Sequence, residues 1–392
     1  MPGRLKAKLL KRSFVVELER RLKEKNPLIQ VILGPRQVGK TTGIGQLSGF
    51  KNSLHYASAD EALNQPPEWI TEHWQAAKLA SRTPILVIDE IQKVTHWSER
   101  IKALWDSEQK NKSNFKLVLL GSSSLDIGSG LDESLTGRFE VIPAHHWNFT
   151  ESVIQFGYTL DEFLLIGGYP AAARFKGNVR RWQSYLKNSI IETVIGKDIL
   201  RYGGVRKPAL FRQTFELLSH YPAQEISYNK LLGQLQESGN VDLVKHYIEL
   251  FEGAFLFKSI HKFSGSVIRQ RSSSPKIFPL CPALYGYRHG SKEFIDPETR
   301  GRVFEAAVGS ELAKLPGELF YWRDKGTAEV DYVYQYGRDL LAIEVKSGRR
   351  KNSHGIQEFL RQYPQAKPVF VTQENFPAFS KDVEKFLKRI II

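Results

Sequence analysis

Cysteine is almost absent from this sequence. Cys281 is the single cysteine among 392 residues, which excludes an internal disulfide framework and makes a reducing compartment, the cytoplasm, the expected location. We expect Cys281 to be a small buried hydrophobe. Long apolar runs are also missing, because no stretch of 18 or more apolar residues could span a bilayer, and no N-terminal signal pattern is found. The sequence therefore predicts a protein without a membrane partner.

Acidic residues are fewer than basic ones. The sequence holds 42 Asp and Glu against 56 Lys and Arg, which gives a formal net charge of +14 and favours a polyanionic partner. Acids are missing altogether between Gly253 and Lys292, where aromatic and serine residues alternate with seven bases: Lys258, Lys262, Arg269, Arg271, Lys276, Arg288 and Lys292. We expect this stretch to contact nucleic acid, with DNA as the favoured form. A solvated basic loop is the alternative interpretation.

A second stretch without acids covers residues 4–12 and carries Arg4, Lys6, Lys8, Lys11 and Arg12. It is either a basic arm or the solvated face of a first helix, and the solvated face is favoured. The histidines, including His145 and His146, show no metal-ligand spacing, and no internal repeat is present. A chain of 392 residues is long enough for two or three domains that each bury a core.

The most informative stretch is LIQVILGPRQVGKTT at residues 28–42. Its apolar start predicts a buried strand of a parallel sheet, and a helix is expected to begin near Lys40. Gly34, Gly39, Lys40 and Thr41 fit the phosphate-loop pattern G-x-x-x-x-G-K-[ST]. In such a loop, backbone N–H groups surround the phosphates, the lysine reaches the β- and γ-phosphates, and the threonine hydroxyl binds Mg²⁺. The predicted ligands are ATP and Mg²⁺, bound by Gly34, Pro35, Arg36, Gln37, Val38, Gly39, Lys40, Thr41 and Thr42.

Two carboxylates follow the apolar strand PILVIDE at residues 84–90. The carboxyl ends of strands are where α/β sheets bind ligands. Asp89 is therefore expected to hold Mg²⁺, and Glu90 to orient or deprotonate the attacking water. Further strands are predicted within residues 52–60 and 115–124.

Two more candidates follow in the same half of the chain. Ser122 or Ser123, at the end of the strand FKLVLLGSSS, is expected to bond the γ-phosphate or the lytic water. Arg138, after a turn glycine in SLTGRFE, is a candidate finger that reaches the γ-phosphate of a neighbouring subunit. A local salt bridge is the alternative for Arg138. The finger hypothesis predicts a homo-oligomer.

The C-terminal segment EVDYVYQYGRDLLAIEVKSG, residues 329–348, predicts two strands joined near Gly337 and Arg338. If Tyr336 faces Asp339, then Asp331 lies opposite Glu344 and Glu329 lies opposite Lys346. Strand alternation places these four charged side chains on one face and puts Val330, Tyr332, Ile343 and Val345 on the other. Asp331 and Glu344 suit a Mg²⁺ site that Glu305, on the preceding helix, would complete, with Lys346 as the lysine that activates water or stabilises the phosphate. Gln357 is a further candidate, and a cross-strand charge ladder is the alternative.

Several segments together resemble a known family. GPRQVGKTT, VIDEIQKV, LLGSSS and SLTGR resemble the AAA-superfamily ATPases of bacteria and archaea. The likeness extends to the subfamily whose C-terminal half is related to PD-(D/E)xK nucleases, because FLLIGGYPAA (163–172) matches its lid signature and VFEAAVGSELAK (303–314) and LLAIEVKSG (340–348) match its C-terminal domain. The resemblance implies an AAA core with Lys40, Thr41, Asp89 and Glu90 at the nucleotide. It also implies a serine sensor and Arg138 as the finger, although no second sensor arginine is evident in the lid.

The predicted fold is α/β with four parts. They are an AAA-type P-loop core with a parallel sheet (1–149), a helical lid (150–205), a winged-helix module with the basic stretch (206–292) and a PD-(D/E)xK nuclease-like domain (293–392). The winged helix follows from the order helix, strand, helix, helix, strand within residues 206–275. The leading functional hypothesis is an ATP-hydrolysing enzyme that acts on DNA and whose C-terminal domain cuts or holds it. The alternative is an ATP-gated switch that binds a protein partner and carries an inactive nuclease fold.

Overall fold

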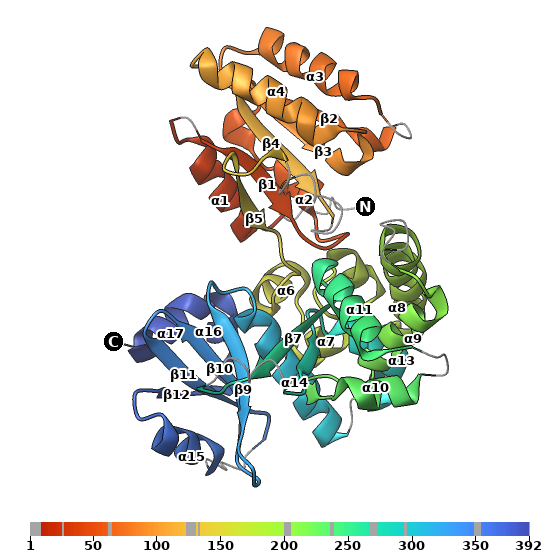
Figure 1. The fold of residues 1–392 in the computed structure, drawn as a ribbon, viewed down its shortest axis with the longest axis vertical. Coiled ribbons are helices and arrows are strands. Elements are labelled where there is room, and N and C mark those ends of the chain that lie inside the picture. The colour runs from red at the N-terminus through yellow and green to blue at the C-terminus, as the bar shows by residue number, and fades with distance from the viewer. Residues whose placement is uncertain are drawn as a thin grey trace, which may run out of the picture. The chain divides into compact units, whose positions relative to one another are not determined.

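The chain folds into two compact units, Met1–His145 and His146–Ile392 (Figure 1). The computed structural model describes residues 9–25, 27–61, 65–122, 131, 134–199, 205–235, 239–265, 273–293, 296–348 and 354–391. None of the helices in these ranges is long and apolar enough to cross a membrane.

A parallel five-stranded sheet forms the centre of the N-terminal unit. Its strands lie in the order β2-β3-β4-β1-β5, and every neighbouring pair is parallel. The strands are β1 (Ile29–Leu33), β2 (Leu54–Ser58), β3 (Ile85–Asp89), β4 (Lys116–Gly121) and β5 (Phe139–Pro143). All residues of β1 and β3 are buried, as expected for apolar strands covered on both faces. The strands predicted at 28–33, 52–60, 84–90 and 115–124 are confirmed.

Helices cover both faces of this sheet (Figure 1). They are α1 (Ser13–Leu22), α2 (Lys40–Ile44), α3 (Pro67–Ala80) and α4 (Trp97–Lys110), and short 3₁₀ segments lie at Ser48–Phe50, Ala59–Glu61 and Ile91–Lys93. The buried side of α1 packs with Val38 and Ile44 over the sheet, and a Cβ on Gly43 would lie 2.4 Å from the Phe14 ring. Gly43 therefore allows α1 and α2 to approach each other closely. On the other face, Trp74 of α3 stacks on Phe115.

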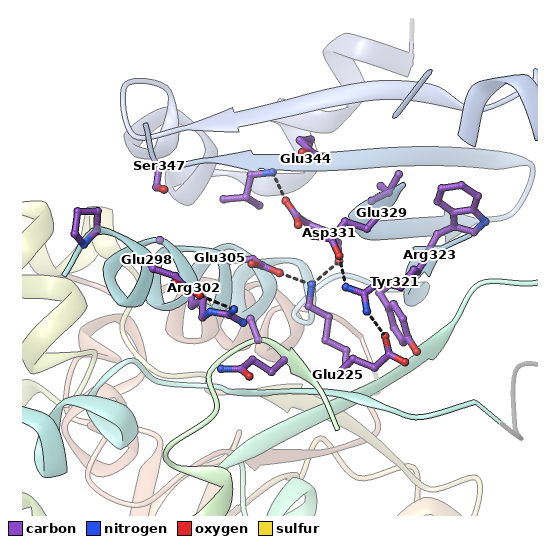
Figure 2. Close-up of a pocket in the computed structure, with 18 residues that line it drawn as sticks. Glu225, Glu298, Arg302, Glu305, Tyr321, Arg323, Glu329, Asp331, Glu344 and Ser347 are labelled. Carbon is purple, nitrogen blue, oxygen red and sulfur yellow. Dashed lines mark hydrogen bonds and ion pairs between the residues drawn. The ribbon is translucent and has the colours of Figure 1, made fainter. Parts of the chain in front are cut away.

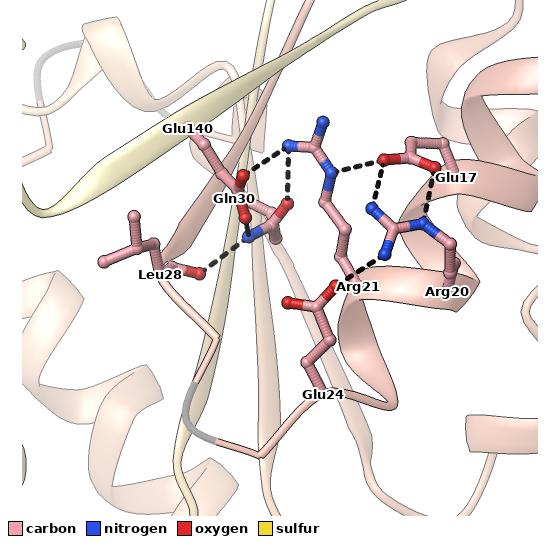
Figure 3. Close-up of polar contacts among 7 residues, drawn as sticks. All are labelled: Glu17, Arg20, Arg21, Glu24, Leu28, Gln30 and Glu140. Atoms are coloured by element: carbon pink, nitrogen blue, oxygen red, sulfur yellow. Dashed lines mark hydrogen bonds and ion pairs between the residues drawn. The ribbon is translucent and has the colours of Figure 1, made fainter.

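A polar network attaches α1 to β1 and β5 (Figure 3). The side-chain amide of the fully buried Gln30 donates to Glu140 at 2.7 Å. Arg21 donates to the Gln30 oxygen at 3.3 Å and ion-pairs with Glu140 at 3.0 Å. Glu17 accepts hydrogen bonds from Arg20 and Arg21, and these bonds lower the pKa of Glu17 to about 2.

Arg12 is buried, whereas the sequence predicted that it lies on a solvated helix face. Only 5 % of its surface is exposed, and its guanidinium donates to the backbone oxygens of Val38 at 3.3 Å and His145 at 2.9 Å. The solvated interpretation is therefore wrong for this residue, because Arg12 bonds the phosphate loop itself at Val38. Lys11 next to it forms a surface ion pair with Glu19. Arg4, Lys6 and Lys8 lie outside the described residues.

The C-terminal unit begins with helices and ends with a mixed sheet. The helices are α6 (Phe149–Phe156), α7 (Leu160–Ile166), α8 (Val179–Tyr185), α9 (Pro208–Leu218), α10 (Tyr228–Gln234), α11 (Val241–Gly253), α13 (Ala283–Glu293), α14 (Pro297–Leu312), α15 (His354–Gln362), α16 (Phe376–Lys381) and α17 (Val383–Ile391). A 3₁₀ segment lies at Pro170–Phe175, and π-helical turns lie at Leu186–Ile191 and Val194–Ile199. Regular α-helical geometry is therefore interrupted between residues 186 and 199.

The strands of this unit form one sheet of seven, in the order β12-β11-β10-β9-β7-β8-β6. They are β6 (Gln224–Glu225), β7 (Phe257–Lys262), β8 (Lys276–Pro279), β9 (Glu318–Arg323), β10 (Glu329–Tyr336), β11 (Asp339–Lys346) and β12 (Lys367–Thr372). The element order predicted for residues 206–275 is confirmed as α9, β6, α10, α11, β7.

One strand pairing joins two segments that the sequence predicts as separate domains. β7 pairs antiparallel with β8 and parallel with β9, where His261 faces Phe320. The sheet is therefore continuous from the segment 206–292 into the segment 293–392 (Figure 1). α14 packs against β8, β10 and β11, while α15 packs against β10, β11 and β12.

The predicted lid signature is a close packing contact within the C-terminal unit. A Cβ on Gly167, whose φ is +74°, would lie 2.6 Å from the Ala283 nitrogen, and one on Gly168 would lie 2.2 Å from the Trp147 oxygen. The Gly168 N–H donates to Cys281 Sγ at 3.2 Å. Cys281 is fully buried, as expected, and burial raises the pKa of its thiol to about 11. Gly167 thus allows the turn after α7 to lie directly against the start of α13, and Gly168 allows the same turn to lie against the backbone of Trp147.

Candidate functional site

The predicted nucleotide residues lie at one edge of the N-terminal sheet. The phosphate loop follows β1, Asp89 ends β3, and Ser122 comes directly after β4. Since β4 lies between β1 and β3 and all three strands are parallel, their carboxyl ends meet at this edge. The structure thus brings the loop, Asp89 and Ser122 together, which is the position at which open α/β sheets bind ligands.

The phosphate loop has the curled backbone that its glycines permit. Gly39 has φ +93° and Gln37 has φ +61°, both in the left-handed region. A Cβ on Gly34 would lie 2.0 Å from the Ala144 oxygen, so this position must be glycine for the loop to lie against the end of β5. Lys40 is 8 % exposed, and its ammonium group donates to the carbonyl oxygens of Gly34 at 2.8 Å and Pro35 at 2.9 Å.

Thr41 and Asp89 lie side by side, as a magnesium site in this position requires. The Thr41 hydroxyl donates to Asp89 Oδ2 at 2.7 Å, and Asp89 is 6 % exposed. The Tyr56 hydroxyl, from β2, donates to the same carboxylate oxygen at 2.7 Å. Burial and the bond to Asp89 raise the pKa of Tyr56. Sequence reasoning missed Tyr56, because its proximity to Asp89 depends on β2 and β3 being neighbours in the sheet.

Glu90 begins the turn after β3. Its φ of +54° places it in the left-handed region, which is uncommon for a residue with a side chain. Gln92, in the 3₁₀ segment Ile91–Lys93, donates to the Glu90 carboxylate at 2.6 Å. Gln92 is a second residue that sequence reasoning missed, although it lies in the quoted motif VIDEIQKV. The left-handed backbone conformation and the hydrogen bond from Gln92 therefore both restrict the position of Glu90.

The hydroxyl of Ser122 is available for a ligand. Ser122 is 4 % exposed, and its Oγ has no hydrogen-bond partner among the described residues. A buried hydroxyl without a partner is costly unless something else bonds it. This supports the choice of Ser122 over its neighbour, and Ser123 lies outside the described residues.

Arg138 forms the local salt bridge that the sequence offered as the alternative. Its guanidinium binds Asp106 of α4 through two bonds, from Nε to Oδ1 at 2.7 Å and from Nη2 to Oδ2 at 3.0 Å. This bond lowers the pKa of Asp106. About a third of each side chain is exposed, so the pair lies at the surface. The finger role of Arg138 stays a prediction.

The donors at this edge fit Mg²⁺ and a triphosphate. The Thr41 hydroxyl and the Asp89 carboxylate are hard oxygen ligands of the kind Mg²⁺ prefers, and they already lie within hydrogen-bond distance of each other. Lys40 and the left-handed turn at Gly39 supply the positive charge and backbone N–H groups that phosphates require.

A second group of charged residues surrounds a cavity of about 470 Å³ in the C-terminal unit (Figure 2). Its lining includes Lys276, Arg302, Glu305, Arg323, Asp331 and Glu344. The predicted hairpin register is confirmed from Tyr336–Asp339 to Tyr332–Ile343. Glu329 ion-pairs with Arg323 of β9. Gln357 is exposed on α15 and is not one of the residues that line the cavity.

A β-bulge changes the predicted faces of β10. Val330 pairs with Trp322 and Val333 pairs with Phe320, so Asp331 and Tyr332 together lie opposite one residue of β9. Asp331 Oδ2 accepts a hydrogen bond from the Val345 N–H at 2.7 Å, and the Tyr332 hydroxyl donates to the backbone carbonyl oxygen of Glu305 at 2.9 Å. The prediction that Tyr332 faces away from the charged residues is therefore wrong. The extra residue in the bulge turns it towards α14.

Lys276 lies among the carboxylates, and no sequence pattern indicated it. Its ammonium group donates to the Glu305 carboxylate and to the Asp331 carbonyl oxygen, the latter at 3.1 Å. The ammonium nitrogen also lies 4.9 Å from the centre of the Tyr332 ring. Lys276 is 8 % exposed and comes from β8. This lysine is therefore an internal counter-ion of the group.

Burial dominates the protonation of this group. Burial raises the pKa of Glu305, the ammonium group of Lys276 opposes this rise, and the charge of Asp331 adds to it. Burial and the charge of Asp331 raise the pKa of Glu344 to about 7, although Lys346 ion-pairs with Glu344. Burial by itself lowers the pKa of Lys276, but the charges of Glu305 and Asp331 outweigh it and the net shift is upward.

The predicted metal ligands Asp331, Glu344 and Glu305 do not form a metal site in this arrangement. Within the described ranges, no three Asp, Glu, His or Cys side chains gather closely enough to hold a metal ion. Each carboxylate also has a partner within the protein: Val345 N–H for Asp331, Lys346 for Glu344 and Lys276 for Glu305. The second carboxylate oxygen of Glu344, Oε2, is buried and has no hydrogen-bond partner among the described residues.

The basic stretch between Gly253 and Lys292 is less available than its sequence suggests. Lys258 ion-pairs with Glu252 at 3.7 Å, and Arg288 ion-pairs with Glu216 at 2.6 Å. The prediction that Lys276 contacts nucleic acid is wrong, because this residue is buried against Glu305. Lys262 is half-buried, while Arg269, Arg271 and the side chain of Lys292 lie outside the described residues.

Comparison with known families divides the chain into three segments. Residues 26–153 match a family described as AAA domain. The N-terminal unit carries an AAA-type P-loop ATPase core. Residues 157–292 match a domain of unknown function (DUF8612), and residues 300–388 match another (DUF4143).

Individual proteins are similar to larger parts of the chain. The chain is 26 % identical over 353 residues to the uncharacterized protein Rv2008c of Mycobacterium tuberculosis, covering 88 % of this chain and 76 % of that protein. It is 24 % identical over 367 residues to the uncharacterized protein MJ1544 of Methanocaldococcus jannaschii, covering 87 % and 78 %. The solved Walker-type ATPase PABY2304 of Pyrococcus abyssi superposes with a TM-score of 0.53 at 14 % identity, over 72 % of this chain and 97 % of that one. At that identity the likeness concerns the fold alone.

Proposed function

We propose that this chain is a Mg²⁺-dependent ATPase that works as a homo-oligomer on nucleic acid, with DNA as the favoured form. The observation that carries the proposal is the Thr41–Asp89 pair at 2.7 Å beside the phosphate loop, at the carboxyl edge of the parallel sheet. These two oxygens, Lys40 and the hydroxyl of Ser122 are what a bound triphosphate needs at that edge.

Nucleotide binding would change the partners of Lys40 from neutral oxygens to charged phosphate oxygens. Lys40 would leave the carbonyl oxygens of Gly34 and Pro35 and bond the β- and γ-phosphates, which attract its charge more strongly than a peptide oxygen does. Thr41 and Asp89 would hold Mg²⁺. The ion, when bound, neutralises charge on the phosphate oxygens. Tyr56 would keep the Asp89 carboxylate oriented through its hydrogen bond.

Glu90 is the residue proposed to direct the attacking water. Its carboxylate follows Asp89 at the end of β3, and Gln92 fixes its orientation through the bond of 2.6 Å. Ser122, whose hydroxyl has no hydrogen-bond partner in the part of the chain that the structure describes, would donate to a γ-phosphate oxygen and report whether that phosphate is present. Both residues directly follow strands of the sheet, which supports these proposed roles.

Nucleic acid is the proposed polyanionic partner because the chain has a formal net charge of +14. A protein partner is the second candidate. It is favoured by the ion pairs that Lys258 and Arg288 form within the protein and by the burial of Lys276, since these leave fewer bases of the stretch 253–292 for phosphates.

The deciding experiment measures ATP turnover of the full chain with and without single-stranded and duplex DNA at several salt concentrations. We expect turnover that depends on Mg²⁺, rises with DNA and loses its DNA response at high salt, since counterion release weakens phosphate contacts. The Lys40→Ala variant should lose turnover in every condition. Turnover in the wild type that never responds to DNA, with no DNA binding at low salt, would favour the protein partner.

A further inference from the structure

The cavity of the C-terminal unit contains an ammonium group where a metal site would need a cation. Lys276 reaches this position from β8, a strand of the preceding segment, and contacts Glu305 of α14 and Asp331 of β10. Figure 2 shows that Glu305 and Asp331 both line this cavity. The ammonium group of Lys276 thus contacts both α14 and β10.

The surroundings of the ammonium group are shaped to hold it. The Tyr332 ring lies 4.9 Å from the nitrogen, a distance suited to a cation–π contact. The hydroxyl of Tyr332 donates to the backbone carbonyl oxygen of Glu305, and this bond positions the ring. A Cβ on Gly309 would lie 2.3 Å from the Tyr332 hydroxyl. Gly309 therefore provides the space for Tyr332, and Tyr332 in turn covers the ammonium.

The strand that carries Lys276 is fixed on both sides. β8 pairs with β7, where Ile260 faces Lys276, and with β6, where Glu225 faces the same residue. A flexible surface lysine could leave its carboxylate easily, but this side chain is nine-tenths buried and comes from the interior of a sheet. Removing the ammonium from Glu305 would leave a buried charge without a partner.

A divalent cation at this place and the Lys276 ammonium group both need the carboxylate of Glu305. Mg²⁺ and Mn²⁺ bind carboxylate oxygens at distances near 2 Å, which a protonated amine bonded to the same carboxylate prevents by both repulsion and volume. Of the other oxygens, Asp331 Oδ2 accepts from the Val345 N–H and Glu344 Oε1 pairs with Lys346, while Glu344 Oε2 has no hydrogen-bond partner among the described residues. No three acidic, histidine or cysteine side chains of the described residues lie close enough together to hold a metal ion, with or without the Glu305 oxygen.

We propose that Lys276 is the resident cation of this centre and takes the place that a divalent metal ion would need between Glu305 and Asp331. The centre consequently binds neither Mg²⁺ nor Mn²⁺ and does not cleave phosphodiesters by a metal-dependent route. This inference is independent of the proposed ATPase function, since it concerns another unit of the chain.

The test counts Mn²⁺ bound by the full chain without nucleotide, from the electron paramagnetic resonance signal of free Mn²⁺. We expect wild type and Asp331→Asn to bind the same number of ions, because any ion at Thr41 and Asp89 is common to both. Lys276→Ala should gain one ion, and Lys276→Ala with Asp331→Asn should lose it again. Lys276→Arg, which keeps the charge, and Lys262→Ala, which changes a base on the neighbouring strand β7, should behave as wild type.

Three results would overturn the proposal. The first is a Mn²⁺ ion in the wild type that disappears in Asp331→Asn. The second is a Lys276→Ala protein that is folded by circular dichroism and gains no ion. The third is nicking of supercoiled DNA by the wild type in Mn²⁺ that Asp331→Asn abolishes. If Lys276→Ala does not fold, the comparison of wild type with Asp331→Asn still decides, since neither protein alters the lysine.

Discussion

Two lysines of this chain are buried to the same degree, but one donates to neutral oxygens and the other to a carboxylate. Lys40 and Lys276 are each 8 % exposed. Lys40 donates to the neutral carbonyl oxygens of Gly34 and Pro35, whereas Lys276 donates to the carboxylate of Glu305. An ammonium on neutral oxygens gains energy when a phosphate arrives, while an ammonium on a carboxylate is already neutralised. The comparison teaches that the partner, and not burial, determines which lysine can serve an anionic ligand.

The same contrast applies to the carboxylates near them. Asp89 is bonded by two hydroxyls, from Thr41 and Tyr56, which can turn their hydrogens away from an arriving metal ion. Glu305 is bonded by an ammonium, which cannot lose its positive charge without losing a proton. We therefore propose that the Asp89 centre is open to Mg²⁺ and that the Glu305 centre is closed by an internal cation.

The largest expected effect is on turnover at the open centre. Glu90→Gln should lower ATP turnover about 10³-fold, because the carboxylate that directs water is lost, while nucleotide binding is kept. Steady-state turnover and fluorescent-nucleotide binding measure the two quantities. Glu99→Gln, an exposed change on α4, is the matched control and should retain turnover. Equal turnover in wild type and Glu90→Gln would remove Glu90 from the mechanism.

The next effect is on stability at the closed centre. Lys276→Met should lower the free energy of unfolding by about 3 kcal/mol, because it leaves Glu305 buried without its counter-ion. Adding Glu305→Gln should restore part of the loss, since the uncompensated charge is then removed. Urea unfolding followed by tryptophan fluorescence measures both. A double variant that is less stable than Lys276→Met would contradict this account of the pair.

A smaller effect tests whether the surface ion pair of Arg138 with Asp106 keeps Arg138 from acting on a neighbouring subunit. If Arg138 serves a neighbouring subunit, Arg138→Ala should lower turnover about 10²-fold, and mixing it with wild type should poison the assemblies. Its bond to Asp106 is solvent-exposed and can exchange, unlike that of Lys276. Specific activity should also rise with protein concentration. Mixtures whose activity is the simple average of the two proteins would leave Arg138 as a salt bridge only.

The smallest effect is a pH dependence of the N-terminal unit. The bonds from Arg20 and Arg21 hold the pKa of Glu17 at about 2, below its ordinary value of 4.5. A carboxyl with a lowered pKa stabilises the folded state above its unfolded pKa, and this stabilisation is lost as pH falls from 4.5 towards 2. Because Glu17 is partly exposed, we expect less than about 1 kcal/mol. Urea unfolding at several pH values should show a shallower fall for Glu17→Gln, and curves parallel to those of wild type would contradict the assignment.

Local patterns made the nucleotide edge predictable. Residues 28–42 contain strand, loop and helix start in one stretch, and Asp89 and Glu90 directly follow an apolar strand. Parallel strands bring such ends together whatever the rest of the chain does. The hairpin of β10 and β11 was predictable for a similar reason, because the turn at Gly337, with φ +60°, fixes the register from Tyr336–Asp339 onward.

Contacts between distant segments were not predictable. Lys276 is 29 residues from Glu305 and 55 from Asp331, and it meets them only because β7 pairs with β9. Its place in a stretch without acids suggested a solvent-facing base instead. Arg12 and Tyr56 were missed for the same reason, since their partners depend on which elements become neighbours. The bulge at Asp331 and Tyr332 likewise changes the direction of the Tyr332 side chain, and the hydrophobic pattern of the sequence does not indicate it.

The sequence by itself determined the strands, the phosphate loop and the carboxylates at the ends of strands, because hydrophobic period and turn residues act over a few positions. The tertiary structure alone decided which charges are open to ligands and which are neutralised within the protein. That choice depends on burial and on partners brought from other segments, and no local pattern records it.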